Sequence, residues 1–275
     1  MASPTSRFGV LALVLLSLGH PVKATETGVN DCSKFKEFGL PQNADRMLCK
    51  RAFLVGYSSK TKTPLWTIER MGRGRIPISR GGESGSFAED TEVPSGIRSL
   101  LADYEGSGYD RGHLVAAGNH VDDPVALAET YLLSNIAPQV GPGFNRGIWR
   151  SLEEAVRNYA QCTSDLLIVT GVYFAEDNTK MTTIGDGRVG VPLGFYKVLL
   201  EPSTRRMIAF LAKNEPYRGV LLATLVTSVD DVERISGQDF FDRLPASVTK
   251  SAESLAPKKE WGMRTQVSLC TISSD

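Results

Sequence analysis

The sequence has few histidines, no excess of basic charge and no long apolar run beyond its first residues. Only three of its 275 residues are histidine, and lysine plus arginine (31) equals aspartate plus glutamate (31). Proteins that bind nucleic acid without sequence preference are usually basic, so any site for a polyanion here must be a local patch. Hydrophobic residues make up 41% and charged residues 23%, which is typical of a globular chain that buries a core.

The N-terminus predicts a secretory signal over residues 1–24. Arg7 supplies the basic charge, residues 8–18 are apolar, and residues 22–24 form a small-x-small cleavage site. The apolar segment is shorter than the roughly 20 residues that span a bilayer. The alternatives are an uncleaved anchor and a mitochondrial presequence, which would be richer in arginine and less uniformly apolar. We therefore expect a secreted or periplasmic protein that begins near Thr25.

Four cysteines remain after that cleavage, and none forms a Cys-x-x-Cys pair, which argues against a zinc or redox site. An even count in an exported chain is typical of disulfides. Of the three pairings available, we favour Cys32–Cys49, a local link in the N-terminal arm, and Cys162–Cys270, which would tie the C-terminus to the body.

The order of apolar segments predicts an α+β protein: a single domain with a central, mostly antiparallel sheet, preceded by an irregular N-terminal arm at residues 25–50. Strands are predicted at residues 52–57, 64–69, 131–135, 166–174, 195–200, 207–212 and 221–226, the first two as a hairpin, with a further strand and loop over 109–119. Helices are predicted at residues 95–104 and 123–129, from 145 onward, and at 228–236. Residues 71–94 are rich in Gly, Ser, Arg and Pro and predict a long loop.

The most informative short motif is Asp110-Arg111-Gly112-His113. Since His20 lies in the predicted signal, His113 and His120 are the imidazoles of the mature chain. The ordinary pKa of imidazole, about 6.5, lets it accept a proton near neutral pH. A carboxylate, a guanidinium, a glycine and an imidazole in succession suit chemistry on a phosphate, so His113 is the candidate proton acceptor. A lone histidine is more often structural, which is the role we expect of His120.

A second motif, Asn145-x-x-x-Trp149-x-x-x-Glu153, opens a predicted amphipathic helix. Residues eight apart project from nearly the same helix face, so Asn145 and Glu153 would point the same way, about 12 Å apart along the axis. Mg²⁺ prefers oxygen ligands and keeps several waters, so the Asn145 amide could bind it directly and Glu153 only through water. Alternatively, Asn145 is a helix N-cap and Glu153 a solvated residue beside Glu154. Trp149 is expected in the core.

With a third motif, Ser134-Asn135-Ile136-Ala137-Pro138-Gln139, these residues resemble in order and spacing the signature of the DNA/RNA non-specific endonucleases. That family includes secreted bacterial nucleases and mitochondrial endonuclease G. The amino-acid sequence at residues 109–114 and 138–145 is similar to that of the endonuclease G branch. The resemblance covers residues 52–244. It implies a ββα-metal endonuclease domain over residues 51–275, with two strands that carry residues 110–113 and a helix that carries residues 145–153.

The resemblance also implies a role for each site residue. His113 would be the general base, and Asn145 would hold a single Mg²⁺, with Mn²⁺ as the alternative. Arg111 and Asn135 would contact the phosphate or the hydrated metal. Glu153 would orient metal-bound water.

The family usually has a further phosphate-binding arginine upstream of the first motif. Arg80 is the first candidate and Arg70 the second. Together with Arg73 and Arg75, these residues form either a solvated loop or the local basic patch that net neutrality demands. Asp110 would orient Arg111 or His113, or only fix the turn.

The implied activity is Mg²⁺-dependent hydrolysis of DNA and RNA to 5′-phosphate products, with activity falling below about pH 6 as the imidazole protonates. Contacts through phosphate give weak sequence preference. The alternatives are a non-catalytic nucleic-acid-binding or partner-binding module on the same fold, and a metal-dependent phosphodiesterase for small substrates. Endonuclease G-like proteins often form homodimers, and a toxin would have an inhibitor protein as partner; the sequence decides neither. No membrane partner is expected after signal cleavage.

Overall fold

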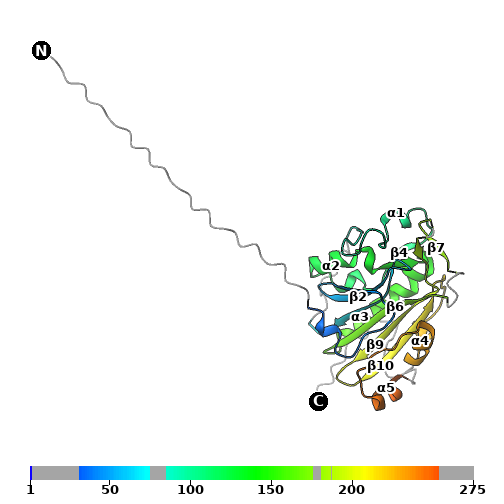
Figure 1. The fold of residues 1–275 in the computed structure, drawn as a ribbon. Helices are drawn as coiled ribbons and strands as arrows, with labels where there is room; N and C mark the ends of the chain where they lie inside the picture. Colours follow the sequence, from blue (N-terminus) through cyan, green and yellow to red (C-terminus); the bar gives the residue numbers. More distant parts are fainter. Residues whose placement is uncertain (2–30, 75–84, 176–180, 187, 254–275) are drawn as a thin grey trace.

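The structure, a computed structural model, describes residue 1 and residues 31–74, 85–175, 181–186 and 188–253 (Figure 1). Residues 2–24 of the predicted signal lie outside the described residues, as do Thr25, Arg75, Arg80 and Cys270. Within the described part, no helix has the length and apolar character needed to cross a membrane.

A seven-stranded antiparallel sheet forms the centre of the molecule, in the order β1-β2-β3-β6-β9-β10-β11. This confirms the predicted α+β class and its mostly antiparallel sheet. The strands are β1 (Arg46–Cys49), β2 (Phe53–Ser58), β3 (Thr63–Met71), β6 (Leu166–Tyr173), β9 (Gly194–Glu201), β10 (Arg206–Lys213) and β11 (Val226–Thr227). A short separate hairpin pairs β7 (Thr183–Ile184) with β8 (Val189–Gly190).

The described part of the N-terminal arm, residues 31–50, is only partly the irregular segment that the sequence predicted. Its last residues form β1, which pairs with β2 at the edge of the sheet. Phe35, in the 3₁₀ helix η1 (Ser33–Phe35), is fully buried in the core. The predicted Cys32–Cys49 disulfide is present and joins η1 to β1. Cys162 is also disulfide-bonded. Residues 31–50 therefore belong to the same folded unit as the sheet.

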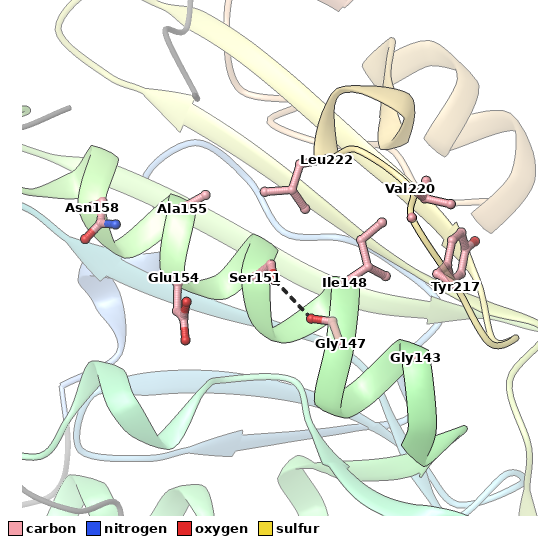
Figure 2. Close-up of a pocket in the computed structure, with 11 residues that line it drawn as sticks. Gly143, Gly147, Ile148, Ser151, Glu154, Ala155, Asn158, Tyr217, Val220 and Leu222 are labelled. Atoms are coloured by element: carbon pink, nitrogen blue, oxygen red, sulfur yellow. Dashed lines mark hydrogen bonds between the residues drawn. The ribbon is translucent and has the colours of Figure 1, made fainter. Parts of the chain in front are cut away.

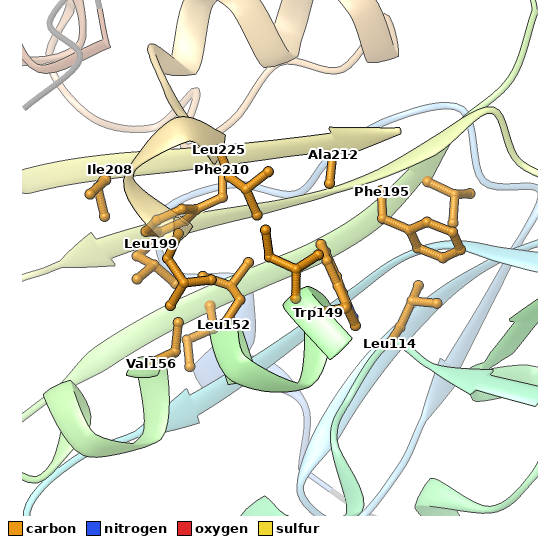
Figure 3. Close-up of a cluster of buried hydrophobic side chains, with 14 of the residues drawn as sticks. Leu114, Trp149, Leu152, Val156, Phe195, Leu199, Ile208, Phe210, Ala212 and Leu225 are labelled. Carbon is orange, nitrogen blue, oxygen red and sulfur yellow. The ribbon is translucent and has the colours of Figure 1, made fainter. Parts of the chain in front are cut away.

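The central strands are buried along their length because both faces of the sheet are covered. In β9, Phe195 and Leu199 point to one core cluster, whereas Tyr196 and Val198 point to the other, as the alternation of side chains along a strand requires. Figure 3 shows the first cluster, where Trp149, Leu152 and Val156 of the helical segment face the sheet. The buried position of Trp149 confirms the sequence prediction.

Five α-helices lie within the described residues, and two of them have the starts that the sequence predicted. They are α1 (Leu101–Tyr104), α2 (Pro124–Thr130), α3 (Arg150–Ala160), α4 (Val229–Ser236) and α5 (Ala246–Glu253). The predicted starts of α2 and α4 are confirmed, since Asp123 and Ser228 accept hydrogen bonds from backbone amides of the first turn. Gly237 ends α4 with φ +67°, the left-handed conformation that glycine adopts most easily.

Two predicted strands are wrong. Residues 131–135 contain the 3₁₀ helix η3 (Leu133–Asn135), and residues 221–226 contain the 3₁₀ helix η6 (Leu222–Leu225). Short apolar runs look alike in sequence whether they form strands or buried helical turns. The predicted helix over residues 95–104 is likewise reduced to α1.

A small antiparallel pair of strands stands apart from the main sheet and carries the first motif. β4 (Asp110–His113) pairs with β5 (Ile136–Gln139), with Asp110 opposite Gln139. A Cβ on Gly112 would lie 2.2 Å from the Gln139 side chain, so the close packing of the pair requires glycine there. The chain then enters a helical segment, η4 (Gly141–Trp149), which continues into α3. Two strands followed by a helix form the predicted ββα finger.

Candidate active site

His113 and Asn145 line the same cavity of about 170 Å³, where β4, η4 and α3 meet. Part of the wall is formed by Ala117, the first residue of the 3₁₀ helix η2 (Ala117–Asn119), and by Ala116, which precedes it. The remaining lining residues are polar and charged: Arg146, Arg150, Glu153, Glu154 and Arg157. The structure thus brings three of the residues predicted from sequence, His113, Asn145 and Glu153, to one space.

Asp110 determines how the Asn145 side chain is oriented. Nδ2 of Asn145 donates a hydrogen bond to Oδ2 of Asp110 at 2.9 Å, and Arg146 Nε lies 3.1 Å from the same oxygen. This anchoring of Asn145 is a role that the sequence analysis did not consider for Asp110. Because the amide nitrogen is committed to Asp110, the amide oxygen is the atom of Asn145 that can act as a ligand.

The imidazole of His113 is packed between aromatic rings. Its ring centroid lies 5.4 Å from that of Phe87 and 5.0 Å from that of Tyr131, the latter in an edge-on arrangement. Nε2 is buried and makes no hydrogen bond among the described residues. Burial lowers the pKa of His113 from 6.5 to about 4, because the charged form loses its hydration. The imidazole is therefore neutral, and able to accept a proton, at neutral pH.

The helix between Asn145 and Glu153 is interrupted. Gly147 has φ −129° and ψ −111°, outside helical values, and the regular turns of α3 begin at Arg150. The predicted unbroken helix between the two residues is therefore wrong. Asn145 and Glu153 nevertheless line the same cavity, as expected. Glu153 is half-buried, whereas Glu154 is exposed and lies 3.2 Å from Arg150 Nε.

Arg111 does not line the cavity. Its guanidinium lies over the rings of Phe87 and Tyr104, at 5.4 and 5.8 Å from their centroids. It donates one hydrogen bond to the Leu101 carbonyl at 3.5 Å. Arg111 and His113 thus contact the same ring, that of Phe87.

Asn135 is fully buried, which does not fit the predicted direct contact with phosphate or metal. Its Oδ1 accepts a hydrogen bond from the Val115 amide, and its Nδ2 donates to the carbonyls of Val115 and Thr130. All of these partners are backbone groups of the segment that follows His113 or precedes Asn135. The side chain therefore holds the loop after β4 in place.

Of the arginines between residues 70 and 80, the structure describes Arg70 and Arg73, and neither lines the cavity. Arg70 pairs with Asp165 and Glu37, and Arg73 donates to the Cys162 carbonyl. The basic residues of the cavity are instead Arg146, Arg150 and Arg157. Sequence analysis missed them, although they recur within three turns of the second motif and could have been recognised from that spacing.

A second, larger groove of about 340 Å³ lies along another side of η4 and α3 (Figure 2). Ile148, Tyr217 and Leu222 form its apolar part, and Glu154 contributes to both this groove and the first cavity. It contains no imidazole and no arginine, so the smaller cavity is the candidate active site.

The cavity suits a hard cation that retains waters. No group of three or more His, Cys, Asp or Glu among the described residues could enclose a metal ion. One neutral amide oxygen, from Asn145, and one carboxylate on the same wall, Glu153, are oxygen ligands of the kind Mg²⁺ prefers while it keeps most of its hydration. The residues present therefore fit the ion that the family resemblance implies.

Comparison with known proteins agrees with this geometry. The family model of the DNA/RNA non-specific endonucleases matches residues 31–247. Nuclease C1 of Cunninghamella echinulata var. echinulata is 36% identical over 77% of this chain and 88% of its own length. Human mitochondrial endonuclease G is 31% identical over 76% of this chain and 74% of its own. A crystal structure of the EndoG/EndoGI complex superposes with a TM-score of 0.70 at 30% identity, over 77% of this chain and 91% of the other. The chain belongs to the DNA/RNA non-specific endonuclease family, and it is a nuclease with the ββα-metal fold.

Proposed function

We propose that this protein hydrolyses the phosphodiester bonds of both DNA and RNA with the help of one Mg²⁺, or Mn²⁺ in its place, and leaves 5′-phosphate ends. The observation that carries the proposal is that His113 and Asn145 line one cavity together with three arginines. A general base, a ligand for a hydrated cation and positive charge for a phosphate are what such a cleavage requires.

Each side chain has a distinct task in this proposal. His113, kept neutral by burial, takes the proton of the attacking water. Asn145 would hold the cation through its amide oxygen, with Asp110 fixing the orientation of the amide. The cation, when bound, supplies positive charge to the phosphate and to the departing oxygen. The arginines of the cavity attract phosphate oxygens whatever the base, so little sequence preference is expected.

We also propose that the protein is exported. The N-terminal residues have the pattern of a secretory signal, and the Cys32–Cys49 disulfide fits an oxidising compartment. Several relatives carry the word mitochondrial in their names, which makes mitochondria the competing location. Because one solved relative is a complex with EndoGI that concerns EndoG inhibition, we propose an inhibitor protein as a partner, beside the nucleic-acid substrate.

Digestion of plasmid DNA and of RNA by the purified mature protein tests the activity. Cleavage of both polymers in Mg²⁺, none in EDTA, and ends that accept a radiolabelled phosphate only after phosphatase treatment would support the proposal. Undiminished cleavage in EDTA, or activity on only one polymer, would refute the mechanism. Binding of DNA without cleavage under every divalent metal would favour the non-catalytic module instead.

A further inference from the structure

Buried polar side chains interrupt the apolar face of the sheet beneath the candidate active site. Glu69 of β3, Thr170 of β6 and Lys197 of β9 are exposed by only 1%, 1% and 2%. Lys197 Nζ donates to Thr170 Oγ1 at 2.7 Å and lies 5.2 Å from the centre of the Trp149 ring. Burying such groups costs free energy unless hydrogen bonds compensate. The three polar side chains therefore suggest that this part of the sheet has a function beyond packing.

Glu69 connects this buried group to the cavity through Asn119. Nδ2 of Asn119 donates to both carboxylate oxygens of Glu69, at 3.0 and 3.1 Å. Oδ1 of Asn119 accepts a hydrogen bond from Nε of Arg157 at 2.9 Å. Arg157 lines the cavity. A continuous chain of side chains therefore runs from the central sheet to the wall of the active site.

The carboxylate dictates the orientation of the Asn119 amide. An ionised carboxylate only accepts hydrogen bonds, so the amide must present its NH₂ group to Glu69 and its oxygen to Arg157. Burial by itself would raise the pKa of Glu69, but the hydrogen bond from His120 and the charges of His120 and Lys197 outweigh it and hold that pKa below its usual value. Glu69 is therefore charged at neutral pH.

We propose that Glu69 is a positioning residue: through Asn119 it fixes the guanidinium of Arg157 at the place where a phosphate of the nucleic-acid strand binds. This inference rests on the proposed nuclease function. It assigns a function to the buried carboxylate of Glu69 in β3, which no motif in the sequence indicated.

The sign of the effect on binding separates positioning from simple electrostatics. Glu69→Gln keeps the shape of the side chain and removes one negative charge near the cavity. If the charge acted only through space, the variant would bind phosphate more tightly. If Glu69 positions Arg157, the glutamine NH₂ group competes with the Asn119 NH₂ group, the amide loses its fixed orientation, and binding weakens.

The experiment measures binding of a fluorescent single-stranded oligonucleotide in EDTA by anisotropy, and cleavage of the same strand in Mg²⁺. We expect Glu69→Gln to weaken binding about tenfold and to lower kcat/KM about 10- to 100-fold, as is typical when a group that orients a site residue is removed. In the Arg157→Ala background, Glu69→Gln should have no further effect, because the two residues act as one unit. Glu201→Gln is the matched control: a buried carboxylate bound by Arg206, outside the cavity, whose loss should leave both readouts unchanged.

Tighter or unchanged binding by Glu69→Gln, or an effect that adds to that of Arg157→Ala, would overturn the inference. If Glu69→Gln fails to fold, Asn119→Ser breaks the same chain of hydrogen bonds and is judged by the same criteria. Exchange of the Arg157 Nε proton, followed by NMR, should be faster in either variant and does not depend on nuclease activity. Absence of binding and cleavage by the unsubstituted protein would instead refute the proposed function, leaving the NMR result to decide on Glu69.

Discussion

At the scale of single residues, burial of His113 determines how the activity should depend on pH. Because burial lowers the pKa of this imidazole to about 4, the base stays available in mildly acidic solution. We therefore expect the acid limb of kcat/KM, which reports the free enzyme, to lie near pH 4 and not near the pH 6 that the sequence suggested. A pH series with a short DNA substrate measures this, and a limb near pH 6.5 would contradict the packing of the ring.

The same group links stability to pH. The unfolded chain binds a proton at His113 with the ordinary pKa of about 6.5, whereas the folded chain binds it only near 4. The unfolded state thus holds more protons between these values, so the contribution of this group to stability is lost as the pH falls from about 6.5 towards 4. Urea unfolding of His113→Ala, compared with the natural chain over this window, should show a weaker dependence on pH.

Asn145 should matter for cleavage far more than for binding. Asn145→Ala removes the amide oxygen proposed to hold the cation and frees Asp110 from its hydrogen bond. We expect the cleavage rate at fixed Mg²⁺ to fall at least about 100-fold, with oligonucleotide binding in EDTA nearly unchanged. Asn158→Ala, an exposed asparagine of α3 that lines only the other groove, is the control. Equal loss in both variants would argue against Asn145 as ligand.

Residue types and spacing were enough to place His113, Asn145 and Glu153 in one cavity. They could not place Asn135, because an asparagine that contacts a ligand and one that bonds buried backbone look the same in sequence. The role of Glu69 could not be predicted from the sequence for another reason. Its connection to Arg157 runs through Asn119, which is 50 positions away from Glu69, and depends on the register of β3 in the sheet.

At the scale of elements, the turn from β5 into η4 depends on Gly141. A Cβ there would lie 2.5 Å from Arg146 Nη2 and 2.7 Å from Asp110 Oδ1. Gly141→Ala should push Asp110 away from Asn145 and lower the cleavage rate about tenfold or more, with a loss of stability within the usual ~0.5–3 kcal/mol of single substitutions. Gly96→Ala, where nothing lies within 4 Å of the added atom, should change neither quantity. Full activity in Gly141→Ala would show that Asp110 is not needed to orient Asn145.

The strands and helix ends that carry strong local signals were predictable. The hairpin of β2 and β3 has two apolar segments on either side of a polar one. The helices α2 and α4 have Asp123 and Ser228 as caps. The interruption at Gly147 was not predictable, since a glycine inside a helical pattern is often tolerated. A Cβ at Gly147 would meet nothing within 4 Å, and hydrophobic periodicity does not report such backbone angles.

At the scale of the whole molecule, the Cys32–Cys49 link holds the N-terminal arm and strand β1 to the sheet. The two cysteines are 17 residues apart, so removing the link should lower the free energy of unfolding by about 3 kcal/mol through the added freedom of the unfolded chain. Urea unfolding of the Cys32→Ser, Cys49→Ser double variant measures this. Met47→Ser, at an exposed position of β1, is the control. A loss below about 1 kcal/mol would mean that the arm is held by its packing alone.

The balance of charge over the whole chain recurs at the cavity. The sequence is neutral, and the three arginines of the cavity stand beside Glu153, Glu154 and Asp110. Three carboxylates stand against three guanidinium groups, so these side chains carry no net formal charge. We therefore infer that affinity for nucleic acid comes from a few direct contacts between guanidinium groups and phosphates, and not from a broad basic surface. That a local patch binds the polyanion stays a prediction, and the sequence alone could not say which arginines would form it.

The cleavage of plasmid DNA by His113→Ala at saturating Mg²⁺ tests most directly whether the cavity of His113 and Asn145 is where phosphodiesters are cut. We expect the rate to fall about 100- to 10,000-fold, the usual contribution of a general base, while the variant stays folded and binds a single-stranded oligonucleotide in EDTA within about twofold of the natural protein. A folded His113→Ala protein that nicks plasmid at the natural rate would contradict the assignment of the active site.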